Sequence, residues 1–527
     1  MFGKIRFFRG IIAIALAVAM LFVGITTDDI MYKHGNEGSD EALSRLNYVN
    51  NNQSAIDNAK GDNTIILWYA DDALTEFLSA AALSFKSETG IRVKPVLVSG
   101  VELLEQINHA SVYEGEVENG EVVLAPDLYI TPHDNLMKAY LSGIACEISD
   151  PKGIVNSVNY PKTSIHAVSC KGVKVAYPLY YETNFFLYNK TYMANIAKQR
   201  IDSENGDYSI EETGEDAGED TVSINNADTL SYDEIVDGED NPMGEEEGTN
   251  DPLVLEKLAN MIPATIDDIL TFANNYDAPE EVEAVFKWDV SDIFYNYFFI
   301  GNYVDVGGVD GDDNKFFNIY NEQAVDCLSV YQNINQFFSI DSKSVTYDSI
   351  LNEFIEGKTV FTVATTDALA KIKEAKSNGE FNYEYGVAVL PDISQTLKAR
   401  GLSETSSIAI NGYSKNKEAA NDFAQFLSYN RADELYRKTG KIACFTNVEY
   451  EDTEIENIMT EYEKSVPLPK MVEASNYWVQ LEIAFTKIWN GADADETLKE
   501  LNDTIGSQID EIDYEVPTQE MINVGAD

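Results

Sequence analysis

Residues 64–98 show three successive patterns of apolar and polar positions that predict a β-α-β unit. The first is a continuous apolar run over Thr64–Trp68, typical of a buried strand. Next, apolar residues recur at spacings of three and four, which predicts a helix with one buried face. The residues of that face are Leu74, Phe77, Leu78, Ala81, Ala82 and Phe85. Thr89-Gly90 ends the predicted helix, and a second strand begins at Ile91.

The same alternation extends along most of the chain. Strands are expected at 125–130, 173–190 (interrupted at Pro178), 358–364 and 385–390, with a hairpin in 302–318. Helices are expected from Thr131-Pro132 to Gly143 and at 266–275, 322–338, 347–357, 418–429, 474–490 and 496–509. Strands that alternate with helices over 527 residues predict an α/β fold with one large two-lobed core or several domains.

The N-terminal residues have the pattern of an export signal. Three basic residues precede an uncharged run, 10–27, and Asp28-Asp29 follow it. A cleaved signal and an uncleaved anchor both fit residues 1–27, and the length of the run favours the anchor. The first cysteine is Cys146, so we do not expect a lipoprotein. Residues 28–62 are rich in Asn, Asp, Ser and Gly and are interpreted as a flexible tether.

The chain is strongly acidic, with 90 Asp and Glu against 37 Lys and Arg and a net charge of −53. A protein that binds the phosphate backbone of nucleic acids needs the opposite balance, so that class is excluded. Acidic residues occur along the whole chain, which indicates a solvated surface. Within 201–250 there are 18 acidic residues and no basic one. We interpret 198–256 as a disordered acidic insertion.

Cysteine and histidine spacing argues against a metal site. The four cysteines have no Cys-x-x-Cys pair and no histidine at ligand spacing, and we expect no metal and no cofactor. A bridge between Cys146 and Cys170 and free buried thiols both remain open.

Seven sequence blocks carry a resemblance to a known family. They are IILWYADD…SFKSETGIRV, PDLYITPHDNLMKAYLSG, VAYPLYYETNFFLYNK, FIEGKTVFTV, YGVAVLPD, SIAINGYSKNKEAANDFAQFL and ASNYWVQLEIAF, and together they span 64–509. Their order resembles that of extracellular family 1 solute-binding proteins of ABC transporters, the maltodextrin-binding-like group. The resemblance implies a type II periplasmic-binding-protein-like fold, in which two α/β lobes joined by hinge crossovers hold a ligand between them.

The resemblance also implies domain limits. The N-terminal lobe would comprise 63–181 and 404–442, and the C-terminal lobe 183–402 and 443–512. Crossings between the lobes are expected at 177–184, 402–407 and 441–445, where a few residues can absorb a change in dihedral angles.

Eight residues are candidates for ligand binding. Carboxylates accept hydroxyl hydrogen bonds and flat rings pack on the C–H faces of a sugar. Positions that match the family's binding groups are Trp68, Asp72, Asp134, Glu182 and Trp478, with Tyr181, Trp288 and Asp289 nearby. No catalytic residue is assigned.

Four of the candidates also have a purely structural explanation. Trp68 and Trp478 also fit a buried core, and Asp72 and Asp134 also fit helix starts, where a carboxylate is favoured without any ligand. Glu182 stands in a nearly continuous apolar stretch, where a carboxylate is costly unless it is paired or faces a cleft. Glu182 is therefore the strongest candidate.

Departures from the family pattern make maltodextrin itself doubtful as the ligand. The segments Thr131-Pro132 and Thr366-Asp367 lack the aromatic residues that stack on maltodextrin, and Ala73 replaces a lysine. We expect a non-catalytic, monomeric, membrane-attached protein that passes a sugar or another polar solute to ABC transporter permeases. Two alternatives stay open. One is a surface sensor or scaffold of the same fold, and the other is an exported glycoside hydrolase.

Overall fold

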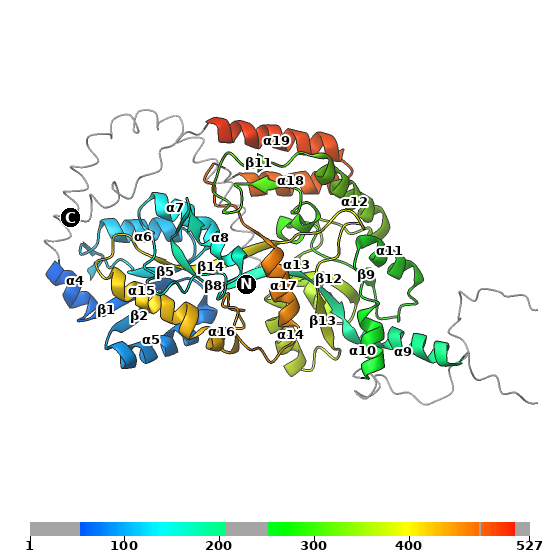
Figure 1. The fold of residues 1–527 in the computed structure, drawn as a ribbon, viewed down its shortest axis with the longest axis horizontal. Helices are drawn as coiled ribbons and strands as arrows, with labels where there is room; N and C mark the ends of the chain where they lie inside the picture. Colours follow the sequence, from blue (N-terminus) through cyan, green and yellow to red (C-terminus); the bar gives the residue numbers. More distant parts are fainter. Residues whose placement is uncertain (1–52, 207–250, 474–475, 512–527) are drawn as a thin grey trace, which may run out of the picture. The chain divides into compact units, whose positions relative to one another are not determined.

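The computed structural model describes residues 53–206, 251–473 and 476–511, which form two compact units (Figure 1). The smaller unit contains 189–262 and 383–385, with helices α9 (Lys190–Gly206) and α10 (Pro252–Ala259). Within it, the backbone N–H of Lys190 donates to the Glu384 carbonyl, and the rings of Tyr192 and Tyr383 pack 5.3 Å apart. The larger unit holds the rest of the described chain.

A mixed sheet organises the larger unit. Its strand order is β2 (Arg92–Leu97), β1 (Thr64–Tyr69), β5 (Leu128–Pro132), β14 (Leu402–Ile410), β8 (Ala176–Asn189), β12 (Thr359–Thr365), β9 (Ala284–Phe286), with β13 (Tyr385–Ala388) beside β8 and β15 (Val466–Pro467) beside β14. Strand β1 is parallel to β2 and β5, and β9 is parallel to β12. Strand β14 is antiparallel to β5 and to β8, and β12 is antiparallel to β8.

The long strands β8 and β14 join two halves of the sheet (Figure 1). We call residues 53–175, which include β1, β2 and β5, the N-terminal half. We call residues 263–382 and the residues from β15 to α19 the C-terminal half, which includes β9 and β12. The two crossing strands belong to both halves.

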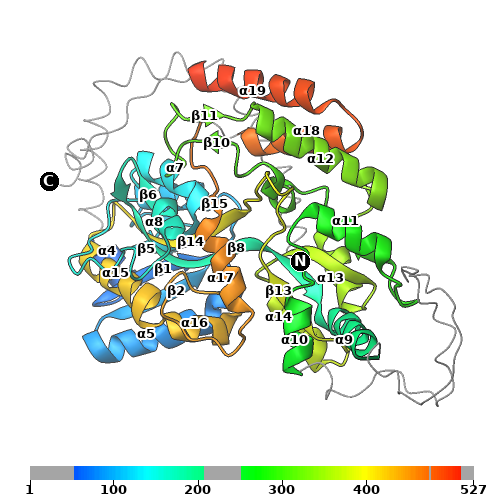
Figure 2. The ribbon, with the colours of Figure 1, turned by 45° about the vertical axis from the view of Figure 1, so that its right-hand side comes forward.

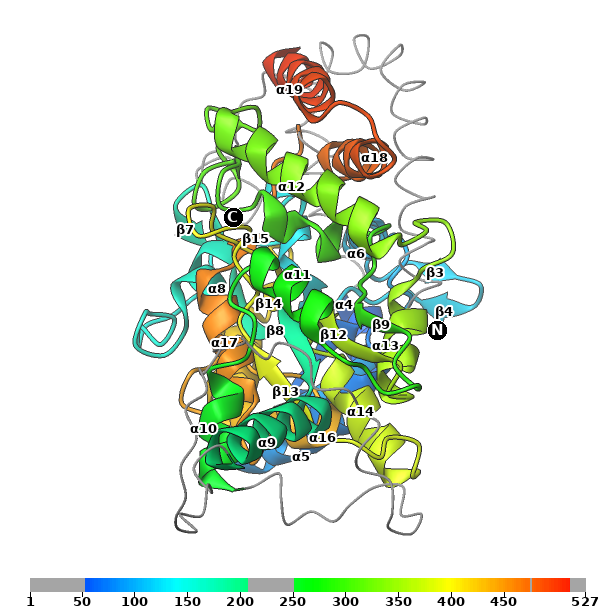
Figure 3. The same ribbon diagram turned by 90° about the vertical axis from the view of Figure 1, so that its right-hand side faces the viewer.

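Helices cover the sheet in both halves (Figure 2). They are α4 (Gln53–Lys60), α5 (Thr75–Thr89), α6 (Leu103–Val112), α7 (Leu136–Leu141), α8 (Lys162–Ala167), α11 (Ile266–Asn275), α12 (Glu322–Phe338), α13 (Tyr347–Ile355), α14 (Ala368–Ser377), α15 (Lys417–Gln425), α16 (Ala432–Thr439), α17 (Ile455–Lys464), α18 (Tyr477–Trp489) and α19 (Ala494–Glu511). In Figure 3, α12, α18 and α19 lie together, and all three pairs are in contact.

Short helical turns and strand pairs complete the unit. The 3₁₀ turns are η1 (Asp72–Leu74), η2 (His133–Asn135), η4 (Ile293–Tyr295) and η5 (Tyr297–Phe299), and a π turn, η6 (Phe426–Asn430), continues α15. The two-residue strands are β3 (Val117–Glu118) with β4 (Glu121–Val122), β6 (Ser169–Cys170) with β7 (Val173–Lys174) and β10 (Asp305–Val306) with β11 (Phe317–Asn318).

The predicted β-α-β unit is present as β1, η1, α5 and β2. The apolar face of α5 is buried, including Phe77, Leu78 and Phe85. Gly90 ends the helix with a φ of 78°, a left-handed conformation that glycine adopts without steric cost.

Two details predicted from the sequence are wrong. Pro178 does not interrupt a strand, because β8 runs through it from Ala176 to Asn189. The register between the two strands shifts at this point, since Ser407 pairs with Pro178 and Ser406 with Tyr180, so that Leu179 of β8 is an extra residue; such an irregularity accommodates a residue without an N–H. The second error concerns Thr131 and Pro132, which were expected as N-cap and first helical residue: both end β5, and Pro132 is the N-cap of η2, which leads into α7.

Several predictions on the N-terminus and the insertion lie outside the described residues. These are the export segment, most of the proposed tether and the centre of the acidic insertion. The edges of the insertion range, 198–206 and 252–256, are helical in α9 and α10, so the prediction of disorder is wrong there. Helix α4 occupies the last part of the tether range, and Ile56 on it is buried. Among the described residues, none of the helices combines the length and the apolar character needed to cross a membrane. All four cysteines are free thiols.

Candidate functional site

The carboxyl ends of the strands in both halves meet at one level of the crossing strand β8. Pro132, the end of β5, lies opposite Ser406, which in turn pairs with Tyr180 of β8. From the other half, the end of β12 pairs Thr365 with Asn184. Glu182 lies between these two levels. In α/β sheets, ligands bind beyond the carboxyl ends of strands at such a switch point.

A lysine connects the carboxylates at this level. Lys441 Nζ lies 3.1 Å from Asp71 Oδ2 and 3.7 Å from Glu182 Oε1, and 5.2 Å from the centre of the Tyr180 ring. The hydroxyl of Tyr180 donates to Asp71 Oδ2 at 3.4 Å. The side chains of Lys441, Asp71 and Glu182 are 15%, 16% and 20% exposed, so the cluster is largely desolvated but still open to solvent. We call Asp71, Tyr180, Glu182 and Lys441 the crossing cluster.

The crossing cluster joins three segments of the chain. Asp71 follows β1, where it also caps η1 by accepting the Ala73 N–H. Tyr180 and Glu182 belong to β8, and Lys441 follows α16 and the left-handed Gly440. The segment after Lys441 pairs with β8, because Tyr181 N–H donates to the Ile442 carbonyl and Cys444 N–H to the Leu179 carbonyl.

The charges in the cluster stabilise one another. Burial opposes the charge of Lys441, but Tyr180, Glu182 and Asp71 outweigh it and hold the pKa of Lys441 above its ordinary value. Burial likewise raises the pKa of the Tyr180 hydroxyl, which stays protonated and able to donate. Lys441 is therefore a permanent cation between two carboxylates. The carboxylate of Glu182, which would be costly in its apolar stretch without a partner, is thus paired with Lys441.

Two further predicted residues lie at the ends of the N-terminal strands. Trp68 is half-buried near the end of β1, and Asp72 is exposed on η1. The helix-capping role foreseen for Asp72 belongs to its neighbour Asp71.

Asp134 lies half-buried on η2, next to a histidine that fixes this turn. The His133 ring accepts the Thr405 N–H on Nδ1 at 3.0 Å, so Nε2 carries the proton and donates to the Leu468 carbonyl at 3.0 Å. Burial, with the nearby charge of Lys470, lowers the pKa of His133 to about 3. A neutral histidine thus holds Asp134 at a fixed place beside β14.

Tyr181 lies on the other face of β8 from Glu182, because neighbouring side chains of a strand point to opposite faces. Its ring stacks on that of Tyr462 of α17, with centroids 3.7 Å apart and planes 5° apart. Tyr181 is only 1% exposed. The structure therefore separates it from the crossing cluster.

Trp288 and Asp289 follow β9 but are buried in the C-terminal half. Trp288 packs on Phe286 and Trp489, and its Nε1 donates to Asn296 Oδ1 at 2.9 Å. Asp289 accepts from the Ser291 N–H and from the Tyr347 N–H. Both side chains are thus engaged in packing and hydrogen bonds, away from the crossing cluster.

Trp478 is half-buried at the start of α18. Its ring lies 5.6 Å from that of Tyr297 and 4.9 Å from that of Tyr477, so one side packs on aromatic neighbours.

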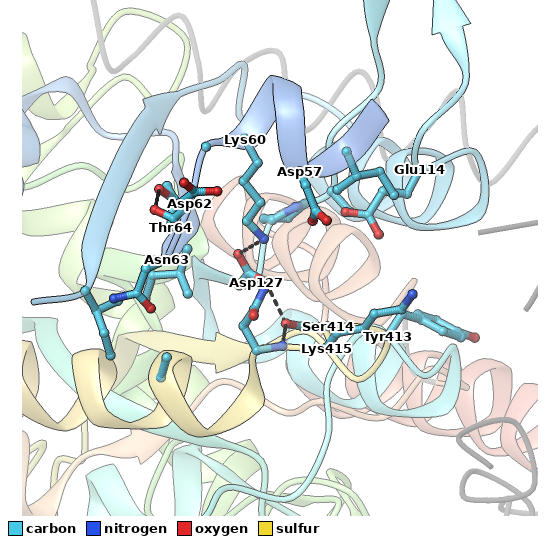
Figure 4. Close-up of a pocket in the computed structure, with 18 residues that line it drawn as sticks. Asp57, Lys60, Asp62, Asn63, Thr64, Glu114, Asp127, Tyr413, Ser414 and Lys415 are labelled. Atoms are coloured by element: carbon cyan, nitrogen blue, oxygen red, sulfur yellow. Dashed lines mark hydrogen bonds and ion pairs between the residues drawn. The ribbon is translucent and has the colours of Figure 1, made fainter. Parts of the chain in front are cut away.

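A separate cavity of about 300 Å³ lies at the opposite, amino-terminal ends of β1 and β5 (Figure 4). Its wall includes the buried ion pair of Lys60 and Asp127, whose charged atoms are 2.6 Å apart. Asp127 also accepts from the Ile66 N–H, Ser414 and Asn416, so its oxygens are saturated within the protein. We place the candidate site at the crossing cluster and not in this cavity, because only the cluster lies where strands of both halves end.

Sequence reasoning missed two members of the cluster, Asp71 and Lys441. Asp71 was not distinguished from its neighbour Asp72, because the sequence does not show which of the two adjacent carboxylates in the turn faces β8. Lys441 was recognised only as part of a crossing, and its single signal is a lysine directly after a glycine that ends a helix.

Comparison with known proteins places the fold. The extracellular solute-binding protein from Staphylococcus aureus, solved with maltose, is 18% identical, with a TM-score of 0.63 over 85% of this chain and 98% of that one. A cyclo/maltodextrin-binding protein complexed with maltotetraose is 17% identical, with a TM-score of 0.63 over 86% and 99% of the two chains. The maltose-binding protein MalE from Listeria monocytogenes, solved with maltose, is 17% identical, with a TM-score of 0.59 over 86% of this chain and 100% of that one. The likeness confirms the predicted type II periplasmic-binding-protein-like fold.

No curated protein sequence matches this chain. The model of the family described as "Bacterial extracellular solute-binding protein" matches residues 69–433, which is more than half of the chain. The matched region begins at the end of β1 and includes both crossing strands. The chain therefore belongs to the family of bacterial extracellular solute-binding proteins.

Proposed function

We propose that the protein captures a sugar or oligosaccharide between its two halves and delivers it to the permease subunits of an ABC importer. It acts as a monomer outside the cytoplasm, attached to the membrane through its N-terminal segment, and does not chemically change its ligand. The similar structures solved with maltose or maltotetraose support a carbohydrate ligand. A different oligosaccharide is favoured over maltodextrin, since the stacking aromatics at Thr131-Pro132 and Thr366-Asp367 are missing.

The crossing cluster is the observation that carries this proposal. It presents two carboxylates, partly exposed, at the level where both halves end. An ionised carboxylate accepts up to four hydrogen bonds, so one that is paired on one side with Lys441 can still accept sugar hydroxyls on the other. A polyhydroxylated ligand fits such acceptors, and the half-buried rings of Trp68 and Trp478 are candidate surfaces for its C–H faces.

In this proposal Lys441 orients the acceptors. It fixes Asp71 of the β1 turn relative to Glu182 of the crossing strand, so both carboxylates are in place before the ligand arrives. Groups ordered in advance lose less conformational entropy on binding. Closure of the halves then follows from ligand contacts with both of them, because a ligand shifts a conformational equilibrium only through its difference in affinity.

The proposal is tested by calorimetry and thermal shift with maltose, maltotriose and a panel of other oligosaccharides. We expect at least one oligosaccharide to bind and to come back uncleaved from prolonged incubation. Lys441→Met should weaken its binding at least tenfold. Lys438→Met is the matched control, because Lys438 pairs with the exposed Glu76 on the surface.

Three results would count against the proposal. Absence of binding across the panel would remove the carbohydrate ligand, and cleavage would favour the hydrolase. Equal affinities in the two lysine variants would remove the crossing cluster as the site.

A further inference from the structure

A second group of charged residues links the two halves away from the crossing cluster. The loop between β10 and β11 belongs to the C-terminal half and contacts the β6–β7 turn of the N-terminal half. The N–H of Lys171 donates to Asp312 Oδ2 at 2.5 Å, and Lys171 Nζ donates to the Asp312 carbonyl at 2.6 Å. Nearby, His166 Nδ1 lies 2.8 Å from Asp310 Oδ1.

Lys470 lies at the centre of these contacts. It is 2% exposed, and its Nζ donates to the carbonyls of His166, at 2.9 Å, and Asp310. Its backbone N–H donates to the Gly311 carbonyl at 2.6 Å. The single ammonium group therefore joins α8 of the N-terminal half to the β10–β11 loop of the C-terminal half.

The close approach at Gly311 depends on the absence of a side chain. Gly311 has a φ of 66°, and a Cβ there would lie 3.0 Å from the Pro469 Cα. The loop thus packs with its backbone directly on the segment that carries Lys470. Asp312, 6% exposed, is held at the same interface.

The contacts form one cooperative set. A buried ammonium is tolerated only while its hydrogen bonds are made, because an unpartnered buried charge is costly. If the halves separate here, Lys470 loses the His166 carbonyl, and the Asp312 and Asp310 carboxylates lose their partners together.

We propose that the loop Gly307–Asp312 and Lys470 form a lock between the halves, which must release before they separate. The lock bonds to neither Asp71 nor Glu182, so it sets the conformational equilibrium and not the ligand chemistry. The lock is connected to the edge of the candidate site through the segment that carries Lys470. In that segment the Leu468 carbonyl accepts a hydrogen bond from His133, which is next to Asp134. The inference does not depend on which solute the protein binds.

The test compares two double variants of the full chain by hydrogen exchange without any ligand. Asp310→Ala with Asp312→Ala removes the two carboxylates that bond across the lock, to His166 and to the Lys171 N–H, and leaves the bonds to backbone carbonyls in place. Asp305→Ala with Asp313→Ala removes the same charge from the same loop, where these carboxylates accept the N–H groups of Gly308 and Lys315. Exchange is followed in 168–175 and 466–473, which contain none of the mutated residues and lie in different halves.

We expect exchange to rise at least tenfold in both segments in the Asp310/Asp312 variant and to stay unchanged in the control. A rise confined to 305–318 would show local fraying and would overturn the lock. Unchanged exchange, or an equal rise in both variants, would overturn it too. If the double variant fails to fold, His166→Ala is tested in its place. His166 is only half-buried, and the same two segments should respond together.

Discussion

The strand ends of the two halves use their carboxylates in opposite ways. In the N-terminal half, Asp71 with the neighbouring Glu182 of β8 keeps part of its surface in solvent and is balanced by Lys441. In the C-terminal half, Asp289 is 5% exposed and accepts backbone and hydroxyl hydrogen bonds from its own loop and from Tyr347. Burial raises the pKa of Asp289 despite these bonds. A position after a strand is thus no sufficient sign of a ligand group, and in our proposal the remaining exposure of the side chain decides.

The largest expected effect is a loss of stability on substitution of Trp288, which tests whether this residue serves packing or ligand binding. Trp288→Ala removes a completely buried ring from an aromatic cluster and leaves Asn296 without its indole partner. We expect a loss of about 3–5 kcal/mol in the free energy of unfolding, measured by chemical denaturation. A stable variant with lost ligand affinity would instead assign Trp288 to the site.

Substitutions of Glu182 and Asp289 test directly whether the carboxylates at the two strand ends differ in role. Glu182→Ala should weaken ligand binding about tenfold or more, roughly 1.4 kcal/mol or above, with little change in melting temperature. Asp289→Ala should leave affinity unchanged but lower stability by about 1–3 kcal/mol, because the Tyr347 N–H loses its acceptor. Calorimetry and thermal melts on both variants provide the measurement. The same response in both variants would abolish the distinction between the two strand ends.

Trp478 should have a smaller effect on binding. Trp478→Ala removes a half-buried ring that, in our proposal, offers one side to a ligand, and we expect affinity to fall several-fold without unfolding. Trp478→Phe is the conservative control and should retain most of the affinity. If neither Trp478→Ala nor Glu182→Ala changes the affinity, the site assignment fails.

The smallest effect concerns Glu482 on α18. Partial burial of the carboxyl group, with the charges of Asp292 and Asp289, raises the pKa of the otherwise exposed Glu482 to about 7. Between its ordinary pKa, near 4.5, and pH 7 the folded state holds more protons than the unfolded state, so stability falls as the pH rises through that range. Glu482→Gln should therefore be more stable than the unaltered protein at pH 8, by no more than about 1 kcal/mol because the side chain is partly solvated. Thermal melts at pH 4 and pH 8 check this, and a gain of equal size at pH 4 would refute it.

Local sequence patterns predicted much of the fold but few residues of the candidate site. The face of α5, the cap Thr265 of α11 and the limits of α12 were predictable, because each depends on residues close in sequence. The unbroken course of β8 through Pro178 was not, because it depends on how β8 pairs with β14, more than two hundred residues away.

The site shows the same division. Glu182 could be proposed as a candidate because a carboxylate in an apolar run is conspicuous in the sequence itself. Its partner Lys441 comes from a distant segment, and no spacing rule connects the two. Whether Trp288 is available to a ligand depends on Trp489 and Phe299, which also approach it only in the folded chain.

Helix α4 has a practical consequence for shortening the chain. The first predicted strand starts at Thr64, which makes residue 63 a tempting place to begin a truncated protein. Such a protein would lack Lys60 and would leave Asp127, whose side chain is 4% exposed, without its cation. Soluble versions intended for crystals or binding assays should therefore start ahead of Gln53, so that the helix and its lysine are retained.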